Sequence, residues 1–168
     1  MENKRSFAVA RPLCYSCGMT KETKTGPVSV GFISLGCSKN LVDSQILAGY
    51  LKAGKIALAA SPETADVILI NTCAFIDAAR EEAAEAILSA CEQKKRGGCK
   101  AVIVAGCMVA RYRERLVKAF PGVDAFLGID ELERVADVVE RVAAKGFRGL
   151  VAAKAAPHKL YEPLFPTL

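Results

Sequence analysis

Three cysteines of this chain each follow a short run of apolar residues. The runs read FISLGC, VILINTC and VIVAGC, and they end at Cys37, Cys73 and Cys107. Continuous apolar runs of this length are typical of strands that are buried on both faces of a parallel sheet. Because thiolates are nucleophiles and ligands for zinc and iron, three cysteines in equivalent places indicate metal or sulfur chemistry.

The pattern around these runs predicts a regular alternation of strands and helices. Strands are expected at residues 30–35, 56–59, 67–70, 101–105 and 124–127, and helices at 40–53, 77–95, 109–120 and from 130 to about 145. Alternation of this kind predicts an α/β fold in three layers, with a mostly parallel sheet and helices on both of its faces. Such a sheet is similar to flavodoxin-like and Rossmann-like domains.

Two of the predicted helices have a recognisable buried face. The helix at 40–53 is expected to bury an apolar side made of Leu41, Ile46, Leu47, Tyr50 and Leu51. The last helix is expected to start at Asp130, with Glu133 at a capping-box spacing, and to bury Leu132, Val135, Ala136, Val139 and Val142.

The predicted sheet brings the three cysteines together. In a parallel sheet all strand carboxyl ends lie at one edge, where ligands bind, and neighbouring strands are about 4.8 Å apart. The helix starts that follow carry partial positive charge, which lowers a thiol pKa and favours the thiolate. Gly36 and Gly106 precede two of the cysteines and allow a sharp turn with close backbone approach. We therefore expect one shared site at Cys37, Cys73 and Cys107.

The residues themselves leave the occupant of this site open. A structural zinc ion usually takes four ligands, and the one histidine, His158, lies in the C-terminal tail. An iron–sulfur cluster is also normally held by four thiolates, so that three would leave one iron open to an added ligand. A further reading is a non-catalytic, doubly wound module that binds a nucleotide or a partner protein, in which the cysteines are buried and inert.

The other four cysteines are not expected to join this site. Cys14 and Cys17 form a Cys-x-x-Cys in an irregular extension and are expected to be incidental thiols. Cys91 falls late in a helix and Cys99 follows a glycine pair, so packing or surface roles are expected. Seven cysteines at wide spacing, with no secretion signal, argue against a disulfide framework and predict a cytoplasmic protein.

Composition excludes several other classes of protein. The 168 residues fit one domain with tails, and 52% of them are hydrophobic. The apolar runs are shorter than the roughly 20 residues that a membrane helix needs, so no membrane partner is expected. The net charge of +5 is spread out without a basic, aromatic face, so direct nucleic-acid binding is not expected. Dinucleotide, Walker and Ser-His-Asp motifs are absent from the sequence.

Three long motifs carry a resemblance to a known family. GFISLGCSKNLVDSQ (31–45), ADVILINTCAFIDAAREEA (65–83) and VIVAGCMVARY (102–112) resemble the N-terminal domain of the radical S-adenosylmethionine methylthiotransferases. The resemblance implies that Cys37, Cys73 and Cys107 are ligands of a 4Fe-4S cluster with one open iron. It covers residues 30–142.

The family has two branches that differ in substrate. CSKNLVDS after the first strand and AFI after Cys73 resemble the branch that methylthiolates an aspartate of a small-subunit ribosomal protein. Gln45 stands where that branch usually has glutamate. The alternative is the branch that methylthiolates an adenosine of tRNA, which tends to carry Gln-Met-Asn after the first cysteine.

The resemblance also implies parts that this sequence does not contain. Family members have a radical domain, in which a Cys-x-x-x-Cys-x-x-Cys triplet holds a second 4Fe-4S cluster that cleaves S-adenosylmethionine, and a C-terminal substrate-binding domain. The triplet is absent here. We therefore expect an irregular extension at 1–28, the methylthiotransferase N-terminal domain at 29–145 and a linker toward the radical domain at 146–168. The chain by itself is expected to be inactive.

Overall fold

A computed structural model describes residues 27–145 and 149–150 of the chain. Cys14, Cys17 and His158 lie outside the described residues, so the roles expected for them stay predictions. The domain boundaries at 28 and 146 also stay predictions. The described part contains every segment that the sequence places around the candidate site.

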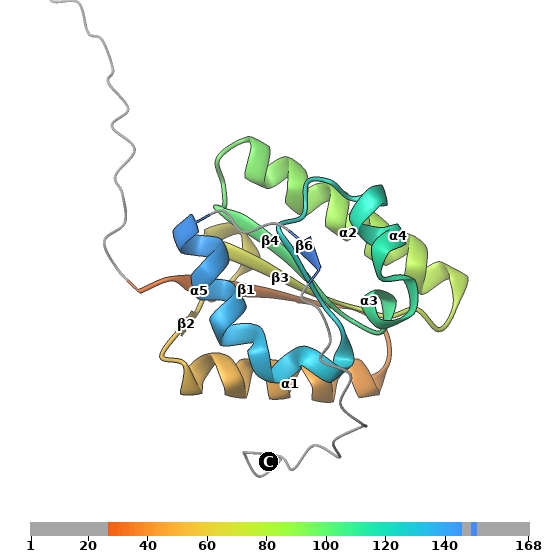
Figure 1. Ribbon diagram of the computed structural model, residues 1–168, viewed down its shortest axis with the longest axis horizontal. Helices are drawn as coiled ribbons and strands as arrows, with labels where there is room; N and C mark the ends of the chain where they lie inside the picture. Colours follow the sequence, from red (N-terminus) through yellow and green to blue (C-terminus); the bar gives the residue numbers. More distant parts are fainter. Residues whose placement is uncertain (1–26, 146–148, 151–168) are drawn as a thin grey trace, which may run out of the picture.

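The predicted parallel sheet is confirmed, and it has six strands (Figure 1). They are β1 (Ser29–Ser34), β2 (Ala57–Leu58), β3 (Val67–Thr72), β4 (Ala101–Gly106), β5 (Ala125–Leu127) and β6 (Gly149–Leu150). All five pairings are parallel, in the order β2-β1-β3-β4-β5-β6. This is the flavodoxin-like order with β6 added at the far edge, and the order reverses between β1 and β3.

Helices cover both faces of the sheet, as predicted. They are α1 (Ser38–Ala53), α2 (Asp77–Lys95), α3 (Cys107–Tyr112), α4 (Glu114–Ala119) and α5 (Val135–Lys145), with 3₁₀ turns at Pro62–Thr64 and Ile129–Arg134. In Figure 1, α1 and α5 lie on one face, and α2, α3 and α4 lie on the other. The domain therefore has the three layers that the sequence indicated.

The core consists of two apolar layers, one on each side of the sheet. Successive residues of β3 point alternately into them: Val67 and Leu69 pack toward α1 and α5, and Ile68 and Ile70 pack toward α2. These four side chains are fully buried, and each contributes roughly 1.5–3 kcal/mol by leaving water. Burial on both faces explains why the strands read as continuous apolar runs.

The first half of α1 buries polar residues, which corrects the sequence prediction. Leu41 was expected on the buried side, but 57% of it is exposed. Asn40 and Ser44 occupy that side instead, in line with the buried Leu47 and Leu51. The spacing of four, three and four residues from Asn40 to Leu51 is one helical stripe. The stripe begins polar because this end of α1 lies over the carboxyl edge of the sheet, where its partners are polar.

The helix predicted at 109–120 is two short helices, and the first begins earlier, at Cys107. Arg113 separates them with a φ of 37°, a value that non-glycine residues rarely adopt. No glycine or proline marks this break in the sequence, so local pattern alone did not reveal it.

The predicted start of the last helix at Asp130 is wrong. Residues Ile129–Arg134 form a 3₁₀ turn, and α5 begins at Val135. The carboxylate that accepts the backbone N–H of Gly128 belongs to Glu131, not to Glu133. The expected stripe is nevertheless confirmed: Leu132, Val135, Val139 and Val142 are buried and Ala136 is partly buried. The segment expected to be a linker contributes β6 to the sheet.

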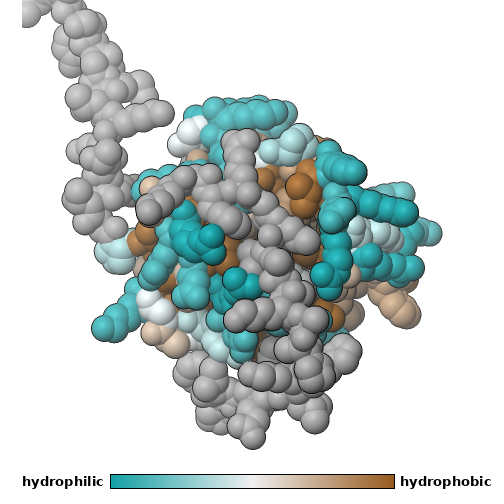
Figure 2. All heavy atoms as spheres, in the orientation of Figure 1, coloured by the Kyte–Doolittle hydropathy of each residue, from teal (hydrophilic) through white to brown (hydrophobic). Residues whose placement is uncertain are grey.

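On the face shown in Figure 2, most of the coloured side chains are hydrophilic, and some hydrophobic side chains are visible between them. Six large hydrophobic side chains are exposed among the described residues: Leu41, Val42, Leu58, Phe75, Ile76 and Leu88. Within residues 27–145 and 149–150, none of the helices combines the length and the apolarity needed to span a bilayer.

An ion pair joins the end of α2 to the start of β5. Lys94 Nζ donates to the carboxylate of Asp124 and, at 2.9 Å, to the carbonyl of Gly122. Asp124 also accepts the backbone N–H of Val102 at 2.9 Å. The side chains of Lys94 and Asp124 are only 18% and 6% exposed. Removal of the Asp124 carboxylate would leave the Lys94 ammonium, which is only 18% exposed, without this ion pair.

We predict that Asp124→Ala lowers the free energy of unfolding by about 3–5 kcal/mol, the usual cost of breaking a buried ion pair. The matched control is Glu92→Ala, which removes an exposed pair with Arg96 on the same helix and should cost at most about 1 kcal/mol. Urea unfolding followed by circular dichroism measures both. Equal losses in the two variants would contradict the prediction.

Candidate functional site

The structure brings Cys37, Cys73 and Cys107 to the same edge of the sheet, as the sequence predicted. Cys73 directly follows β3, Cys107 directly follows β4, and Cys37 precedes α1 three residues after β1. These three strands are neighbours in the sheet, and β1 and β3 flank the point where the strand order reverses. In doubly wound sheets this crevice is where ligands bind.

The strand register decides how the three cysteines meet. Thr72 pairs with Gly106, so Cys73 and Cys107 come next at equivalent positions. Ser34 pairs with Asn71. The same offset carried two residues further places Gly36 beside Cys73, and Cys37 extends one residue beyond.

Gly36, in the loop after β1, lies against Cys73, in the loop after β3. Its φ is +99°, and a Cβ atom on it would lie 3.1 Å from the sulfur of Cys73 and closer still to the Cβ of Cys73. A side chain at this position would therefore push the first loop away from Cys73. The predicted role of Gly36 in a sharp turn with close backbone approach is confirmed.

Gly106 plays the same part for the third loop. Its φ is +102°, and a Cβ atom on it would lie 2.6 Å from the carbonyl oxygen of Thr72 and against Oδ1 of Asn71. The sulfur of Cys107 then faces the side chain of Asn40 on α1, at 3.9 Å from Oδ1. The first and third loops are thus in contact through α1.

The three thiols have different surroundings. Cys37 is exposed, Cys107 is half-buried and Cys73 is buried. The backbone N–H groups of Asn40 and Lys39, at the start of α1, hold the pKa of Cys37 below its ordinary value. Burial raises the pKa of Cys107, against the opposing charge of Lys39. The expected thiolate stabilisation at helix starts is confirmed for Cys37 and wrong for Cys107, where burial is the larger effect.

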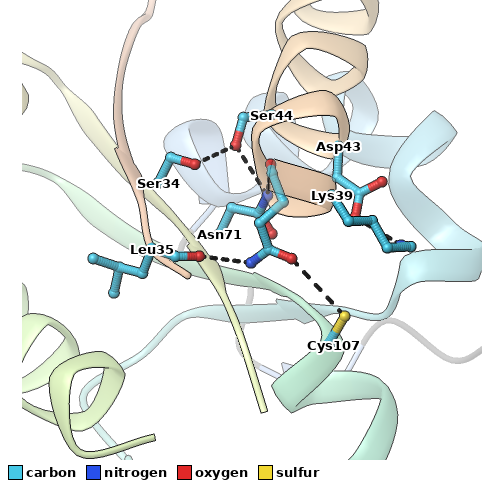
Figure 3. Close-up of polar contacts among 8 residues, drawn as sticks. Ser34, Leu35, Lys39, Asp43, Ser44, Asn71 and Cys107 are labelled. Atoms are coloured by element: carbon cyan, nitrogen blue, oxygen red, sulfur yellow. Dashed lines mark hydrogen bonds and ion pairs between the residues drawn. The ribbon is translucent and has the colours of Figure 1, made fainter. Parts of the chain in front are cut away.

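A buried polar network lies under the three loops (Figure 3). Asn71 donates to the carbonyl of Asn40 and to the hydroxyl of Ser44, both at 2.9 Å. Asn40 donates to the carbonyl of Leu35 at 2.7 Å, and Ser44 shares a hydrogen bond of 2.8 Å with Ser34. Sequence reasoning missed this network. Its signals were a polar residue ending an apolar strand and two polar residues in the helical stripe of Leu47 and Leu51.

One ion pair faces the sulfur edge. Lys39 donates to Asp43 at 3.1 Å, and the Asp43 carboxylate raises the pKa of Lys39. The charges of Cys107 and Cys37 raise the pKa of Lys39 in the same direction, by less than Asp43 does. The Lys39 side chain is 62% exposed, whereas that of Asp43 is 8% exposed. A cation near negatively charged sulfur lowers the electrostatic cost of gathering thiolates.

Four exposed apolar residues follow the first two cysteines in the sequence and are called the apolar rim. It consists of Leu41, Val42, Phe75 and Ile76, which follow Cys37 and Cys73 within five residues. They are four of the six exposed large hydrophobic side chains among the described residues, and Phe75 is 86% exposed. Clustered apolar exposure of this kind usually marks a contact surface or a ligand-binding edge.

Thiolates are the ligands of iron–sulfur clusters and are also common ligands of zinc. Among the described residues, no three His, Cys, Asp or Glu side chains are close enough to hold a single metal ion. In a cluster each thiolate binds a different iron, so the sulfurs stand further apart than around one ion. Three thiols, two glycines with positive φ and a buried polar network lie at this one edge.

Cys91 and Cys99 lie away from this edge, in the apolar layer beneath α2. Both are buried. Burial raises the pKa of Cys91 and raises that of Cys99 to about 11. The packing role predicted for them is confirmed.

The fold and the site together define a flavodoxin-like domain whose switch point is lined by cysteines. Comparison with known families then identifies it: the chain belongs to the uncharacterized protein family UPF0004, whose profile matches residues 29–128. The match spans the sheet from β1 to the end of β5 and includes all three candidate cysteines.

Curated relatives confirm the resemblance to methylthiotransferases. The chain is 48% identical over 118 residues to the ribosomal protein uS12 methylthiotransferase RimO of Symbiobacterium thermophilum, which is 70% of this chain and 24% of the relative. The protein of the same name from Solibacter usitatus is 49% identical over 113 residues, covering 67% and 24%. That of Pelotomaculum thermopropionicum is 37% identical over 139 residues, covering 83% and 31%. The chain thus spans about a quarter of the length of these relatives.

We predict that Gly36→Ala both destabilises the domain and separates the first two loops. The left-handed backbone costs roughly 1–2 kcal/mol for a residue with a Cβ, and overlap with Cys73 adds about 1–3 kcal/mol. The control is Gly97→Ala, where φ is +80° but no atom lies within 4 Å of the added Cβ, so only the backbone cost remains. Chemical unfolding measures both, and equal losses would contradict the overlap.

We also predict an order of alkylation by iodoacetamide in the metal-free protein. Cys37 should react first, and its rate should rise at lower pH than that of an ordinary thiol, because its pKa is lowered and it is exposed. Cys91 and Cys99 should react only when the protein unfolds. Peptide mass spectrometry across a pH series measures this order. Reaction of Cys37 no faster than Cys99 would refute it.

Proposed function

We propose that Cys37, Cys73 and Cys107 are the three protein ligands of a 4Fe-4S cluster that has one open iron. The observation that supports this most is the register of β1, β3 and β4, because each of these three neighbouring strands is followed by one cysteine at the same edge of the sheet. When bound, such a group supplies a sulfur that can be transferred to a substrate carbon. Because the protein would supply three ligands in place of the usual four, one iron would stay open, and that sulfur would be presented there.

We further propose that the chain is the auxiliary-cluster domain of an enzyme that inserts a methylthio group into an aspartate of a small-subunit ribosomal protein. The names of its relatives support the substrate, since they are ribosomal protein uS12 methylthiotransferases. The enzyme would include a radical domain, which holds S-adenosylmethionine and a second 4Fe-4S cluster, and a substrate-binding domain. Its place of action would be the cytoplasm.

The residues around the cysteines have defined parts in this proposal. The backbone N–H groups at the start of α1 favour the Cys37 thiolate that a metal requires. The Lys39 ammonium offsets negative charge at the sulfurs. The apolar rim limits the access of water to the edge and offers a surface on which an apolar part of a substrate or of another domain can pack.

The alternatives from the sequence fare differently. The tRNA adenosine branch of the family remains the second candidate. The CSKN sequence after the first strand is the main feature by which this chain differs from that branch, and substrate recognition lies in other domains. The inert-cysteine module is disfavoured by the exposure of Cys37 and by the contact of Gly36 with Cys73. Neither feature is expected of unrelated core cysteines.

We predict that anaerobic reconstitution with iron and sulfide produces a brown protein whose iron content depends on these three cysteines. Cys37→Ala, Cys73→Ala and Cys107→Ala should each lose most of the iron and the broad visible absorbance, because two thiolates hold a cluster poorly. The matched controls are Cys91→Ala and Cys99→Ala, which remove buried thiols away from the edge. They should keep the wild-type iron content.

Iron and acid-labile sulfide per chain, with the visible spectrum, decide the outcome. If the three edge variants keep the wild-type values, the ligand assignment fails. If the protein instead takes up zinc, without colour and with the same dependence on cysteine, the site binds a metal but the methylthiotransferase role fails. Folding of every variant is checked by circular dichroism, so that loss of iron is not confused with unfolding.

A further inference from the structure

Asn71 is a fully buried amide on β3, a central strand of which every residue is buried. The four residues that begin the same strand, Val67 to Ile70, are apolar and fully buried. A buried amide costs free energy unless its hydrogen bonds are satisfied, so a polar side chain here needs a reason. Asn71 lies two residues before Cys73, at the edge where the three cysteines meet.

The nitrogen of this amide holds the loop of Cys37. It donates to the carbonyl of Asn40 and to the hydroxyl of Ser44, both on α1 and both at 2.9 Å (Figure 3). Cys37 directly precedes α1. These two bonds tie the start of that helix to β3, and so set the distance of Cys37 from Cys73.

The oxygen of the same amide faces the loop of Cys107. Oδ1 is the one buried side-chain N or O atom in the described part of the chain without a hydrogen-bond partner. It lies against the α-carbon of Gly106, where a Cβ would overlap it. A Cα–H of glycine is a weak donor to such an oxygen. Asn71 therefore touches the residue that precedes Cys107 and excludes any side chain there.

Asn40 carries the connection one step further. Its amide donates to the carbonyl of Leu35 at 2.7 Å, before Cys37, and its Oδ1 lies 3.9 Å from the sulfur of Cys107. Asn71 holds the backbone of Asn40 in place through the carbonyl. The orientation of the Asn40 side chain toward both loops thus depends on Asn71.

We propose that Asn71 is a positioning residue that holds all three cysteine-bearing loops in the arrangement needed to bind one group. What that group is rests on the proposed function, but the positioning itself does not. Partners that orient metal ligands typically change affinity by about 10–100-fold when they are removed. Asn71 acts on three ligands through a single side chain, and we expect a loss within this range.

The chain offers a matched control at the other end of β3. Asp66 directly precedes the strand and ties its neighbours in the same way: it accepts the backbone N–H of Ser29 at 3.1 Å and its hydroxyl at 2.9 Å, and it pairs with Lys100 at 3.1 Å. Asn71 is five residues along the chain from Asp66, which places the two ties roughly 16–17 Å apart. Asp66→Ala therefore removes a similar polar tie far from the cysteines.

The experiment compares Asn71→Ala with Asp66→Ala in the full 168-residue chain. The first readout needs no metal: diamide oxidises Cys37 and Cys73 to a disulfide, accepting their two electrons and two protons, and mass spectrometry follows the rate. We expect Asn71→Ala to slow this reaction at least about tenfold, and Asp66→Ala to leave it near the wild-type rate. The second readout is the iron bound at limiting iron, together with the electron paramagnetic resonance signal of the reduced cluster.

Ser44→Ala keeps the inference falsifiable if Asn71→Ala does not fold. It removes one of the two acceptors of Asn71, and we expect a smaller change in both readouts in the same direction. Wild-type oxidation rates in both variants, or equal changes in Asp66→Ala, would overturn the positioning role. Should the wild-type chain bind no iron while the oxidation rates still differ, the proposed cluster fails and the role of Asn71 stands.

Discussion

Parallel pairing of β1, β3 and β4 in one register is the constraint on which the rest of this domain depends. The pairs Ser34–Asn71 and Thr72–Gly106 decide which residues leave the sheet together, and the next residues along the chain are the thiols or the glycines beside them. The apolar layers on both faces hold this register, because a slip of one residue would turn every strand side chain to the opposite face. The stability of the core and the geometry of the site are therefore one property.

Bringing the three loops close together at this edge creates steric clashes and buries backbone polar groups. Glycines relieve the clashes, and polar side chains hydrogen-bond to the buried groups. Gly36 and Gly106 adopt positive φ, and a Cβ on either of them would collide with the adjacent loop. Loops that lie so near each other bury backbone groups away from their ladder partners. The amides of Asn40 and Asn71 satisfy several of these groups, and the hydroxyl of Thr72 donates to the carbonyl of Ala105 at 2.7 Å. The polar network is thus a consequence of bringing three strand ends together.

The strands and the meeting of the cysteines could be predicted from the sequence because both follow from local pattern. Apolar runs indicate buried strands, and in a parallel sheet the carboxyl ends of these strands lie at one edge. The sequence predictions were wrong where contacts with distant residues decide which side chains are buried and where helices begin and end. Leu41 fits an apolar helix face by spacing, but Asn40 is buried in its place, where its side-chain amide donates to the carbonyl of Leu35. Arg113 breaks a helix although no glycine or proline is present there. Glu131 accepts the backbone N–H of Gly128, whereas the sequence spacing suggested a capping box of Asp130 and Glu133. No local signal encodes such contacts.

The unequal exposure of the three thiols indicates where the site opens. Cys73 lies in the interior and Cys107 is half covered, whereas Cys37 is exposed on the side that carries Lys39 and the start of the apolar rim. A group held by all three sulfurs would be enclosed on the Cys73 side and accessible on the other. Anything delivered to it would approach past an ammonium and four apolar side chains. An ammonium attracts negatively charged ligands, and exposed apolar side chains favour a contact surface from which water is excluded.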